Sequence, residues 1–458
     1  MVGEATVLED FEWQPQPKAA QFVQQLVTEL QNRLPEMDSI ANRLRTETGT
    51  RLFDWVDHLA LREGRNIDGQ LNGHGFLPEE MGDKTVWRHP RAIFPPICIA
   101  DTDKEHLALK VESVMQFLHA HRARDNAVIE GGPTGQLQRV CFVGNETTEL
   151  QVVERHGFDG FEIPFGEPDR VNCAMKNGDA FLQRKRNFGT DSEGFEHARQ
   201  LVHKARSELG VDWACDLFFA GERSYWQSRN RAAQVQKARQ DALGLGWANH
   251  DHHTYRSSRE HFALLISVLE DLGFQCRERF YAGRDAGWGA QVLEQSTCGI
   301  TIFADVDLRA EEVAGDFAHD GLEPQKELGT VGLWCKLHGE AFLQAGMHHL
   351  ECQFDSDAAR KQLAGEGINT MEPFTDFPYL KQAFTEGEIW QVSDQRIDTT
   401  LAGGFITSEQ AERFRKSGSI GSHLEILQRD DGYKGFNQTG ISEIIRETDP
   451  RRPQHYGS

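Results

Sequence analysis

The segment HDHHTYRSSREHFALLISVLEDLG, residues 250–273, decides the fold of this chain. It begins with an extended stretch at 252–256, after which Ser257 and Glu260 form a capping box for a helix. That helix carries apolar side chains on one face and ends at Gly273. Three further extended segments follow, at residues 274–280, 290–295 and 299–306. The unit is therefore one strand, one helix and then three strands.

The same order of elements recurs along the chain without sequence identity between the copies. The first copy has a strand at 53–62, an edge strand at 92–100, a helix capped by Thr102 and Glu105, and strands at 137–143 and 149–154. A second copy is predicted over 178–225, with a helix at 193–209 and a strand at 213–220. The last copy starts with a strand at 348–354, continues with a helix to about 364, and ends with extended segments at 389–394 and 422–429.

This recurrence predicts an α+β protein in which βαβββ modules pair into a cupped mixed sheet. Phe22, Leu26 and Leu30 lie four residues apart and mark an amphipathic helix, which Pro35 ends. We therefore expect a helical lead over residues 1–50, an N-terminal half over 51–245 and a C-terminal half over 246–458.

The charge and hydrophobic composition of the chain limit the partners that it can bind. The 458 residues include 49 Lys and Arg against 71 Asp and Glu, a net charge of −22, which repels nucleic acid and anionic membranes. No stretch reaches the roughly 20 apolar residues of a membrane helix, and Met1 to Asp10 is acidic where a leader is basic. A cytoplasmic protein is expected. The eight cysteines are scattered, which favours buried, reduced thiols.

Three of the predicted first strands place a histidine near their start, at His58, His252 and His349. The last strand carries Glu425. Strand residues alternate between the two faces, so these side chains can point into a cup. Two histidines and one carboxylate leave open positions on an octahedral metal, an arrangement that suits Fe(II). Glu294 and Glu154 are reserve carboxylates, for which an ion pair or a solvated face is the simpler role.

Several short motifs resemble one enzyme family. Asp57-His58-Leu59-Ala60-Leu61-Arg62 is similar to the first metal strand of the 2-oxoadipate dioxygenase/decarboxylase family, which is related to the vicinal-oxygen-chelate enzymes. The segment 251–256 resembles that family's second metal strand, and 424–436 its closing strand and the glycine-aromatic loop after it. The tail also resembles the 4-hydroxyphenylpyruvate dioxygenases. The matches cover residues 50–120, 247–300 and 420–448.

The resemblance implies that His58, His252 and Glu425 bind Fe(II) and that Arg62 holds a substrate carboxylate. Arg62 lies four residues after His58 on the same strand face, about 13 Å along the strand. A small dicarboxylate fits this spacing, with its 2-oxo acid end on the metal and its far end on the guanidinium. The alternative for Arg62 is a surface ion pair with Glu63 or Asp57.

A second ligand set remains open, because Glu425 lies 173 residues after His252, farther than in the compact members of the family. In that set His252, His349 and Glu425 bind the metal, as in the hydroxyphenylpyruvate enzymes, and His58 is structural. We favour the first set, since His58 occurs together with Arg62 in a five-residue match. Which of His250, His252 and His253 faces the metal depends on the strand register.

The resemblance implies an Fe(II)-dependent dioxygenase that takes a small anionic 2-oxo acid and dioxygen. It implies conversion of 2-oxoadipate to 2-hydroxyglutarate with loss of CO2, a reaction of lysine degradation. Two alternatives stay open: another metal-dependent reaction in the same cup, such as a lyase or extradiol reaction, and a binding protein that sequesters a small ligand without turnover.

Overall fold

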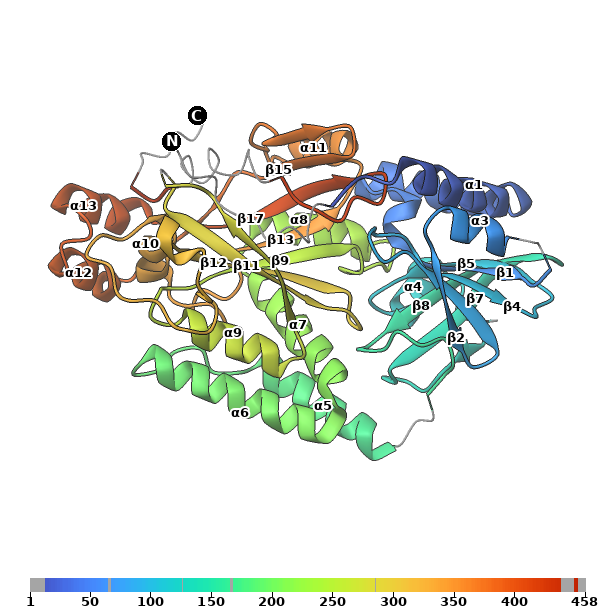
Figure 1. The fold of residues 1–458 in the computed structure, drawn as a ribbon, viewed down its shortest axis with the longest axis horizontal. Helices are drawn as coiled ribbons and strands as arrows, with labels where there is room; N and C mark the ends of the chain where they lie inside the picture. Colours follow the sequence, from blue (N-terminus) through green and yellow to red (C-terminus); the bar gives the residue numbers. More distant parts are fainter. Residues whose placement is uncertain are drawn as a thin grey trace.

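Two mixed β-sheets lie side by side along the long axis of the molecule (Figure 1). The computed structural model describes residues 13–64, 67–125, 127–164, 168–284, 286–437 and 449–451. The acidic start, Met1 to Asp10, and the end of the family resemblance at 438–448 lie outside the described residues. Within those residues, no helix has the length and apolar character needed to cross a membrane.

The N-terminal sheet consists of two strand–helix–three-strand units. The first contains β1 (Val56–Arg62), α3 (Asp68–Gly73), β2 (Leu77–Met81), β3 (Lys84–Arg88) and β4 (Ile97–Ala100). The second contains β5 (Glu105–Lys110), α4 (Val114–Ala120), β6 (Ile129–Glu130), β7 (Leu137–Gly144) and β8 (Thr148–Arg155). In each unit the first and last strands pair in parallel, and β1 pairs antiparallel with β5. The strand order is β2-β3-β4-β1-β5-β8-β7-β6.

The C-terminal sheet repeats this plan. Its first unit contains β9 (His250–Arg256), α9 (Phe262–Asp271), β10 (Gln275–Tyr281), β11 (Trp288–Gln295) and β12 (Ile300–Asp307). Its second contains β13 (His349–Gln353), α11 (Ser356–Gly365), β14 (Thr375–Phe377), β15 (Leu380–Phe384) and β17 (Ser419–Arg429). The order is β10-β11-β12-β9-β13-β17-β15-β14, and β16 (Glu388–Trp390) pairs with β17. The predicted α+β fold of paired βαβββ modules is confirmed.

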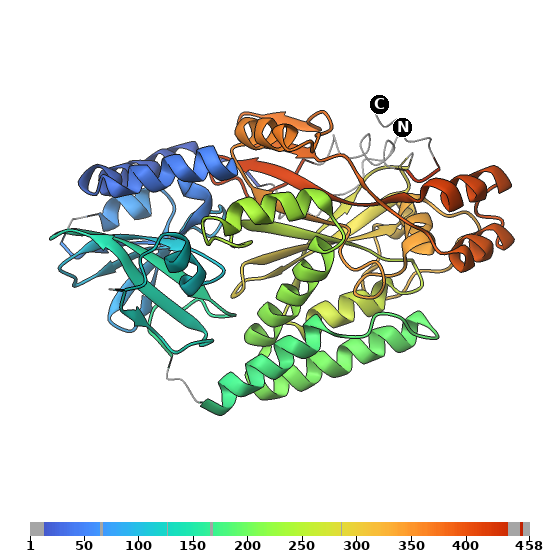
Figure 2. The same ribbon diagram turned by 180° about the vertical axis from the view of Figure 1, so that it is seen from behind.

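Helices cover both sheets (Figures 1 and 2). The lead contains α1 (Pro17–Arg33), α2 (Glu36–Arg43) and the short turns η1 (Leu44–Thr48) and η2 (Leu52–Trp55). The connection between the sheets contains α5 (Pro168–Leu182), α6 (Asp191–Leu209), α7 (Val211–Gln227) and α8 (Arg231–Asp241). The later insertions contain η3 (Ala310–Glu312), α10 (Thr330–His338), α12 (Asp394–Ala402) and α13 (Ser408–Ser417). The apolar face of α1 shares one core with the N-terminal sheet, and α6 and α7 share another with the C-terminal sheet.

Two predictions within the first predicted copy, residues 53–154, were wrong. Residues 105–110 form the central strand β5, not a helix, and the helix begins only after Ser113, whose Oγ accepts a hydrogen bond from Gln116 N. Leu107 and Val111 suit either period, but Leu107, Leu109 and Val111 also alternate, and pairing with both β1 and β8 buries this segment as a strand. The apolar run at 92–100 gives β4, which lies between β3 and β1 and is not an edge strand.

The strands predicted within the copy at 178–225 were also wrong, because this region is helical, but its predicted helix at 193–209 is confirmed as α6. The run at 213–220 is apolar without a clear period, and a short run of this kind fits a buried strand or a buried helix equally well. In the structure it belongs to α7, and Cys215, Phe218 and Phe219 lie in the core beneath the C-terminal sheet.

Polar contacts hold the two halves together. Arg51 donates to the Asp430 carboxylate and to the Arg429 carbonyl, at 2.6 and 3.0 Å. His156, which follows β8, lies 2.9 Å from Asp216 on α7 and 2.8 Å from Glu154. Burial lowers the pKa of His156, but the hydrogen bonds to Asp216 and Glu154 outweigh it and raise the pKa to about 10.

The contacts of His156 with Asp216 and Glu154 predict that part of the free energy of unfolding depends on pH. Because the folded pKa lies above the unfolded value of about 6.5, the contribution is fully present below pH 6.5 and disappears as the pH rises to about 10. We expect His156→Asn to lower the free energy of unfolding by on the order of a few kcal/mol at pH 6 and by much less at pH 10. Urea denaturation of both proteins across this range, with the exposed His119→Asn as control, measures the difference. A difference that does not change with pH would contradict the assignment.

Candidate metal centre

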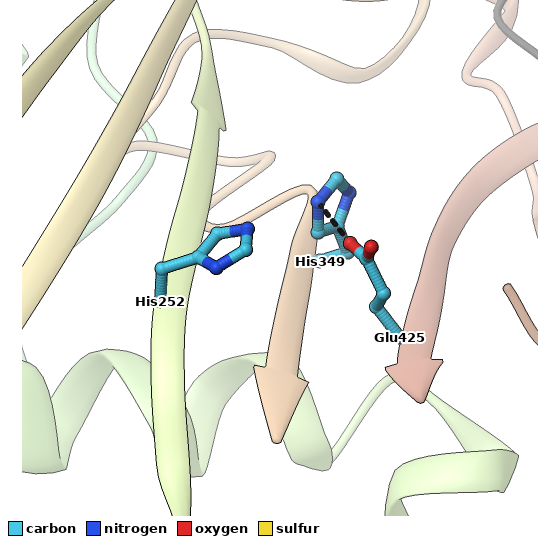
Figure 3. A group of neighbouring side chains, drawn as sticks. All are labelled: His252, His349 and Glu425. Atoms are coloured by element: carbon cyan, nitrogen blue, oxygen red, sulfur yellow. Dashed lines mark ion pairs between the residues drawn. The ribbon is translucent and has the colours of Figure 1, made fainter. Parts of the chain in front are cut away.

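Three side chains from neighbouring strands converge at the centre of the C-terminal sheet. His252 projects from β9, His349 from β13 and Glu425 from β17, and their potential ligand atoms lie within 4.8 Å of one another (Figure 3). His349 Nε2 lies 3.2 Å from Glu425 Oε2. All three residues are buried. Two imidazoles and one carboxylate therefore face one point in the interior.

The strand register brings these residues together. β9 pairs antiparallel with β13, and β13 pairs in parallel with β17, so the three strands are adjacent. His349 is opposite Thr254, two residues beyond His252, and Glu425 is opposite Glu351, two residues beyond His349. Positions two apart share a face of the sheet. All the side chains named here therefore project from the same face.

Hydrogen bonds fix the orientation of His252. Its Nδ1 lies 3.1 Å from Asp251 Oδ1, and Asp251 accepts two hydrogen bonds of 2.9 Å from Arg429. Burial raises the pKa of Asp251, but the charge of Arg429 outweighs it and holds that pKa below its usual range. Because an ionised carboxylate only accepts hydrogen bonds, Nδ1 of His252 carries the proton and Nε2 presents a lone pair toward the site.

Two further residues contact the carboxylate. Gln382 on β15 donates to Glu425 Oε1 and to Glu351 Oε1, each at 3.1 Å. Oε2 of Glu351 contacts His252 Nε2. Burial and the charge of Glu425 raise the pKa of Glu351 well above its usual value, and burial raises that of Glu425 to about 7. Together the two acids hold more negative charge than the buried site neutralises.

The converging side chains border a small, partly open cavity of about 40 Å³. Its wall is largely aromatic, with histidines and a few polar groups: His252, Thr254, Arg256, Trp288, Phe303, Asp305, His348, His349, Gln382, Phe384, His423, Glu425 and Phe436. Arg256 is buried, its Nε has no hydrogen-bond partner among the described residues, and it lies 3.9 Å from Asp305. Burial raises the pKa of Asp305 to about 7. Because the neighbours of Arg256 neutralise little of its positive charge, this guanidinium favours an anionic ligand.

The other predicted residues lie elsewhere. His58 is on β1 in the other sheet, beside Asp57 and His106, and the structure does not bring it to His252 and Glu425. Arg62 is exposed at the end of β1 and donates to the Thr102 and Asp103 carbonyls.

The reserve carboxylates have structural partners. Glu294 pairs with Lys434 at 3.0 Å and with Arg277 at 3.5 Å. Glu154 accepts from the Val114 N–H at the start of α4. Neither lines the cavity.

The register also separates the histidines of the 250–253 cluster. His252 faces the cavity, whereas His253 is buried on the other face near Phe219, with its ring 5.3 Å from that of His250. Sequence reasoning missed Glu351 and Gln382 as site residues. Alternation from His349 along the same strand was the available signal for Glu351, and no comparable signal marked Gln382.

Comparisons with known proteins show low similarity. No protein-family model and no curated protein sequence matches the chain. A mutant 4-hydroxymandelate synthase from Streptomyces coelicolor aligns over 86% of this chain and 99% of its own, with 13% identity and a TM-score of 0.28. A methylmalonyl-CoA epimerase from Mycobacterium tuberculosis aligns over 40% and 88%, with 13% identity and a TM-score of 0.23. A protein from Shewanella frigidimarina with a suggested hydrolase activity aligns over 49% and 98%, with 13% identity and a TM-score of 0.35.

The geometry predicts which substitutions abolish tight metal binding. His349→Ala and Glu425→Gln each remove one of the converging donors, and we expect either change to weaken the tightest-bound Fe(II) or Co(II) by more than about 100-fold. We expect His58→Ala to keep this most tightly bound metal ion, because His58 lies in the other sheet. Titration of metal-free protein, followed by metal analysis, measures both. If His58→Ala lost the tightly bound metal ion and His349→Ala kept it, the ligand would be His58 and not His349.

Proposed function

We propose that this protein is a non-haem Fe(II)-dependent dioxygenase that decarboxylates a small 2-oxo acid. The convergence of His252, His349 and Glu425 in a buried cavity carries the proposal. Two histidines and one carboxylate on one side of a metal are typical of non-haem Fe(II) oxygenases, because open positions remain for substrate and dioxygen.

The residues present fit such a metal. His252 is held with Nε2 as the free donor, and the buried acids beside it lack a compensating charge, which a divalent cation supplies. When bound, Fe(II) provides Lewis-acid and redox chemistry with dioxygen. The chain itself orients the donors: Asp251 holds the His252 ring and Gln382 holds the Glu425 carboxylate.

Arg256 is the residue we propose for binding the far carboxylate of the substrate. It lies four residues after His252 on the same strand face, about 13 Å along β9, and it lines the cavity. The spacing matches the one that led to Arg62 in the sequence, but Arg256 is buried beside the converging donors and Arg62 is exposed. A dicarboxylic 2-oxo acid uses both ends of this arrangement, so we propose 2-oxoadipate as the substrate.

The proposed reaction is balanced. One molecule of 2-oxoadipate and one of dioxygen give one 2-hydroxyglutarate and one CO2. The bond between the carboxyl and keto carbons breaks, and both atoms of dioxygen enter the products. The aromatic wall formed by Trp288, Phe303, Phe384 and Phe436 excludes water from this chemistry.

The same aromatic wall supports a second candidate, an aryl 2-oxo acid of the 4-hydroxyphenylpyruvate type. Phe303 and Phe436 pack edge to face, with ring centroids 4.4 Å apart, and Phe436 packs in the same way on His252 at 4.9 Å. An aromatic substrate can pack against these rings. Arg256 favours the dicarboxylate, and the aromatic side chains favour the aryl compound.

Oxygen uptake distinguishes these possibilities. We expect Fe(II)-loaded protein to consume dioxygen and release an equal amount of CO2 with 2-oxoadipate, and His349→Ala to abolish both. Uptake with 4-hydroxyphenylpyruvate alone would select the aryl substrate. Tight binding of both acids without uptake would support a protein that sequesters its ligand, and would refute the dioxygenase.

Arg256→Gln tests the substrate-binding role. Loss of a charge-assisted hydrogen bond of about 1.5–3 kcal/mol predicts a 10- to 100-fold higher KM for 2-oxoadipate, with a smaller change for a 2-oxo acid that has no second carboxylate. Arg62→Gln is the matched control and is expected to leave both KM values near those of the unaltered protein. Equal effects of the two substitutions would exclude Arg256 from this role.

A further inference from the structure

The N-terminal sheet repeats the geometry of the proposed metal centre. His106 on β5 is opposite Ala60, two residues beyond His58, just as His349 is opposite Thr254, two beyond His252. Gln151 on β8 is opposite Ala108, two residues beyond His106, just as Glu425 is opposite Glu351. His58, His106 and Gln151 therefore occupy the positions of His252, His349 and Glu425.

The residues around these positions are repeated as well. Asp57 lies 2.7 Å from His58 Nδ1, and Arg155, four residues after Gln151, donates to Asp57 through Nε and Nη2 at 2.8 and 2.9 Å. Asp251 and Arg429 make the same contacts with each other and with His252.

The aromatic contact on the histidine is also repeated. The Phe161 ring packs on His58 with centroids 4.9 Å apart, the separation found between Phe436 and His252. Arg155 bonds the Gly160 carbonyl just before that ring, as Arg429 bonds Gly435. The aspartate, the arginine and the aromatic ring that hold the first histidine are therefore all present in the N-terminal sheet.

The donors of the N-terminal set are neutral. Gln151 stands where the other sheet has Glu425, and Ala108 stands where it has Glu351. Since the Asp57 carboxylate accepts a hydrogen bond from the Nδ1–H of His58, His58 Nε2 presents a lone pair. His106 Nε2 lies 3.2 Å from it. Two nitrogens bound to one metal at about 2.0–2.1 Å lie roughly 3.0–3.4 Å apart, so the two rings are already spaced as ligands.

The third donor is available too. Gln151 Oε1 is inaccessible to solvent and has no hydrogen-bond partner among the described residues, although its Nε2 donates to Glu149 at 3.4 Å. His106 and Gln151 are only half-buried, which leaves an approach for an ion.

We propose that His58, His106 and Gln151 bind one divalent transition-metal ion of the zinc type, in a second site independent of the proposed function. Imidazole donors suit zinc, copper and nickel, whereas three neutral donors leave the charge of the ion uncompensated. The site is therefore weaker than the C-terminal one. A bound ion would link β1 and β5, the strands at which the two N-terminal units meet.

The test starts from a background in which the C-terminal set is disabled, the double variant His349→Ala, Glu425→Gln. Calorimetric titration of this metal-free protein with Zn²⁺ is expected to show one bound ion per chain. Adding His106→Ala is expected to abolish the binding of this ion, whereas adding the exposed control His119→Ala leaves it unchanged. The comparison separates this site from the exposed group Glu270, Cys276 and His319, which His106→Ala does not alter. Absence of any equivalent sensitive to His106→Ala overturns the proposal.

Gln151→Glu provides a second measurement that does not depend on removing a ring. It restores the carboxylate found in the other sheet, and we expect Zn²⁺ to bind at least about 10-fold more tightly. An unchanged affinity overturns the proposal. Circular dichroism of each variant confirms that the fold is retained.

Discussion

The pairing register of β9, β13 and β17 is the constraint on which the site depends. Each strand contributes one donor, and the donors meet only because positions two residues apart share a face. A shift of one residue in β13 would turn His349 and Glu351 to the other face and bring Leu350 and Cys352 to the face of the site. The large cores on both sides of the sheet fix this register, because a slip would bury polar groups in them.

The buried charges then determine which ligands the site prefers. Asp251, Glu351 and Glu425 are buried together, and two carboxylates about 4 Å apart repel by about 4 kcal/mol at an effective dielectric constant of 20. Arg429 compensates Asp251, whereas burial raises the pKa values of both glutamates and the charge of Glu425 adds to the rise for Glu351. Either a proton or a cation relieves it. In a chain of net charge −22, a site of this kind selects cations first and accepts an anionic substrate only through that cation and Arg256.

The sequence predicted the recurring strand and helix plan and located β9 to β12 closely, because buried strands and a glycine after a helix have local signals. It failed at β5, where Leu107 and Val111 satisfy both periods, and at α7, where a continuous apolar run has none. It also favoured His58 over His349 as the second histidine, whereas the structure groups His349 with His252 and Glu425. Both begin a first strand, and only the assembled sheets show that β9 and β13 share one centre while β1 belongs to another.

The duplicated geometry explains why that choice was difficult. His58 carries the same neighbours as His252: an aspartate before it, an arginine four residues after it, and an aromatic ring packed on its imidazole. What separates the two copies is the third position, where Gln151 replaces a carboxylate, and the opposing position, where Ala108 replaces a second acid. One sheet thus has a carboxylate donor, Glu425, beside a small cavity, whereas the other has three neutral donors, of which His106 and Gln151 are half-buried. A motif around one histidine identifies the residues that orient it, but the charge of its partners one and two strands away decides the chemistry.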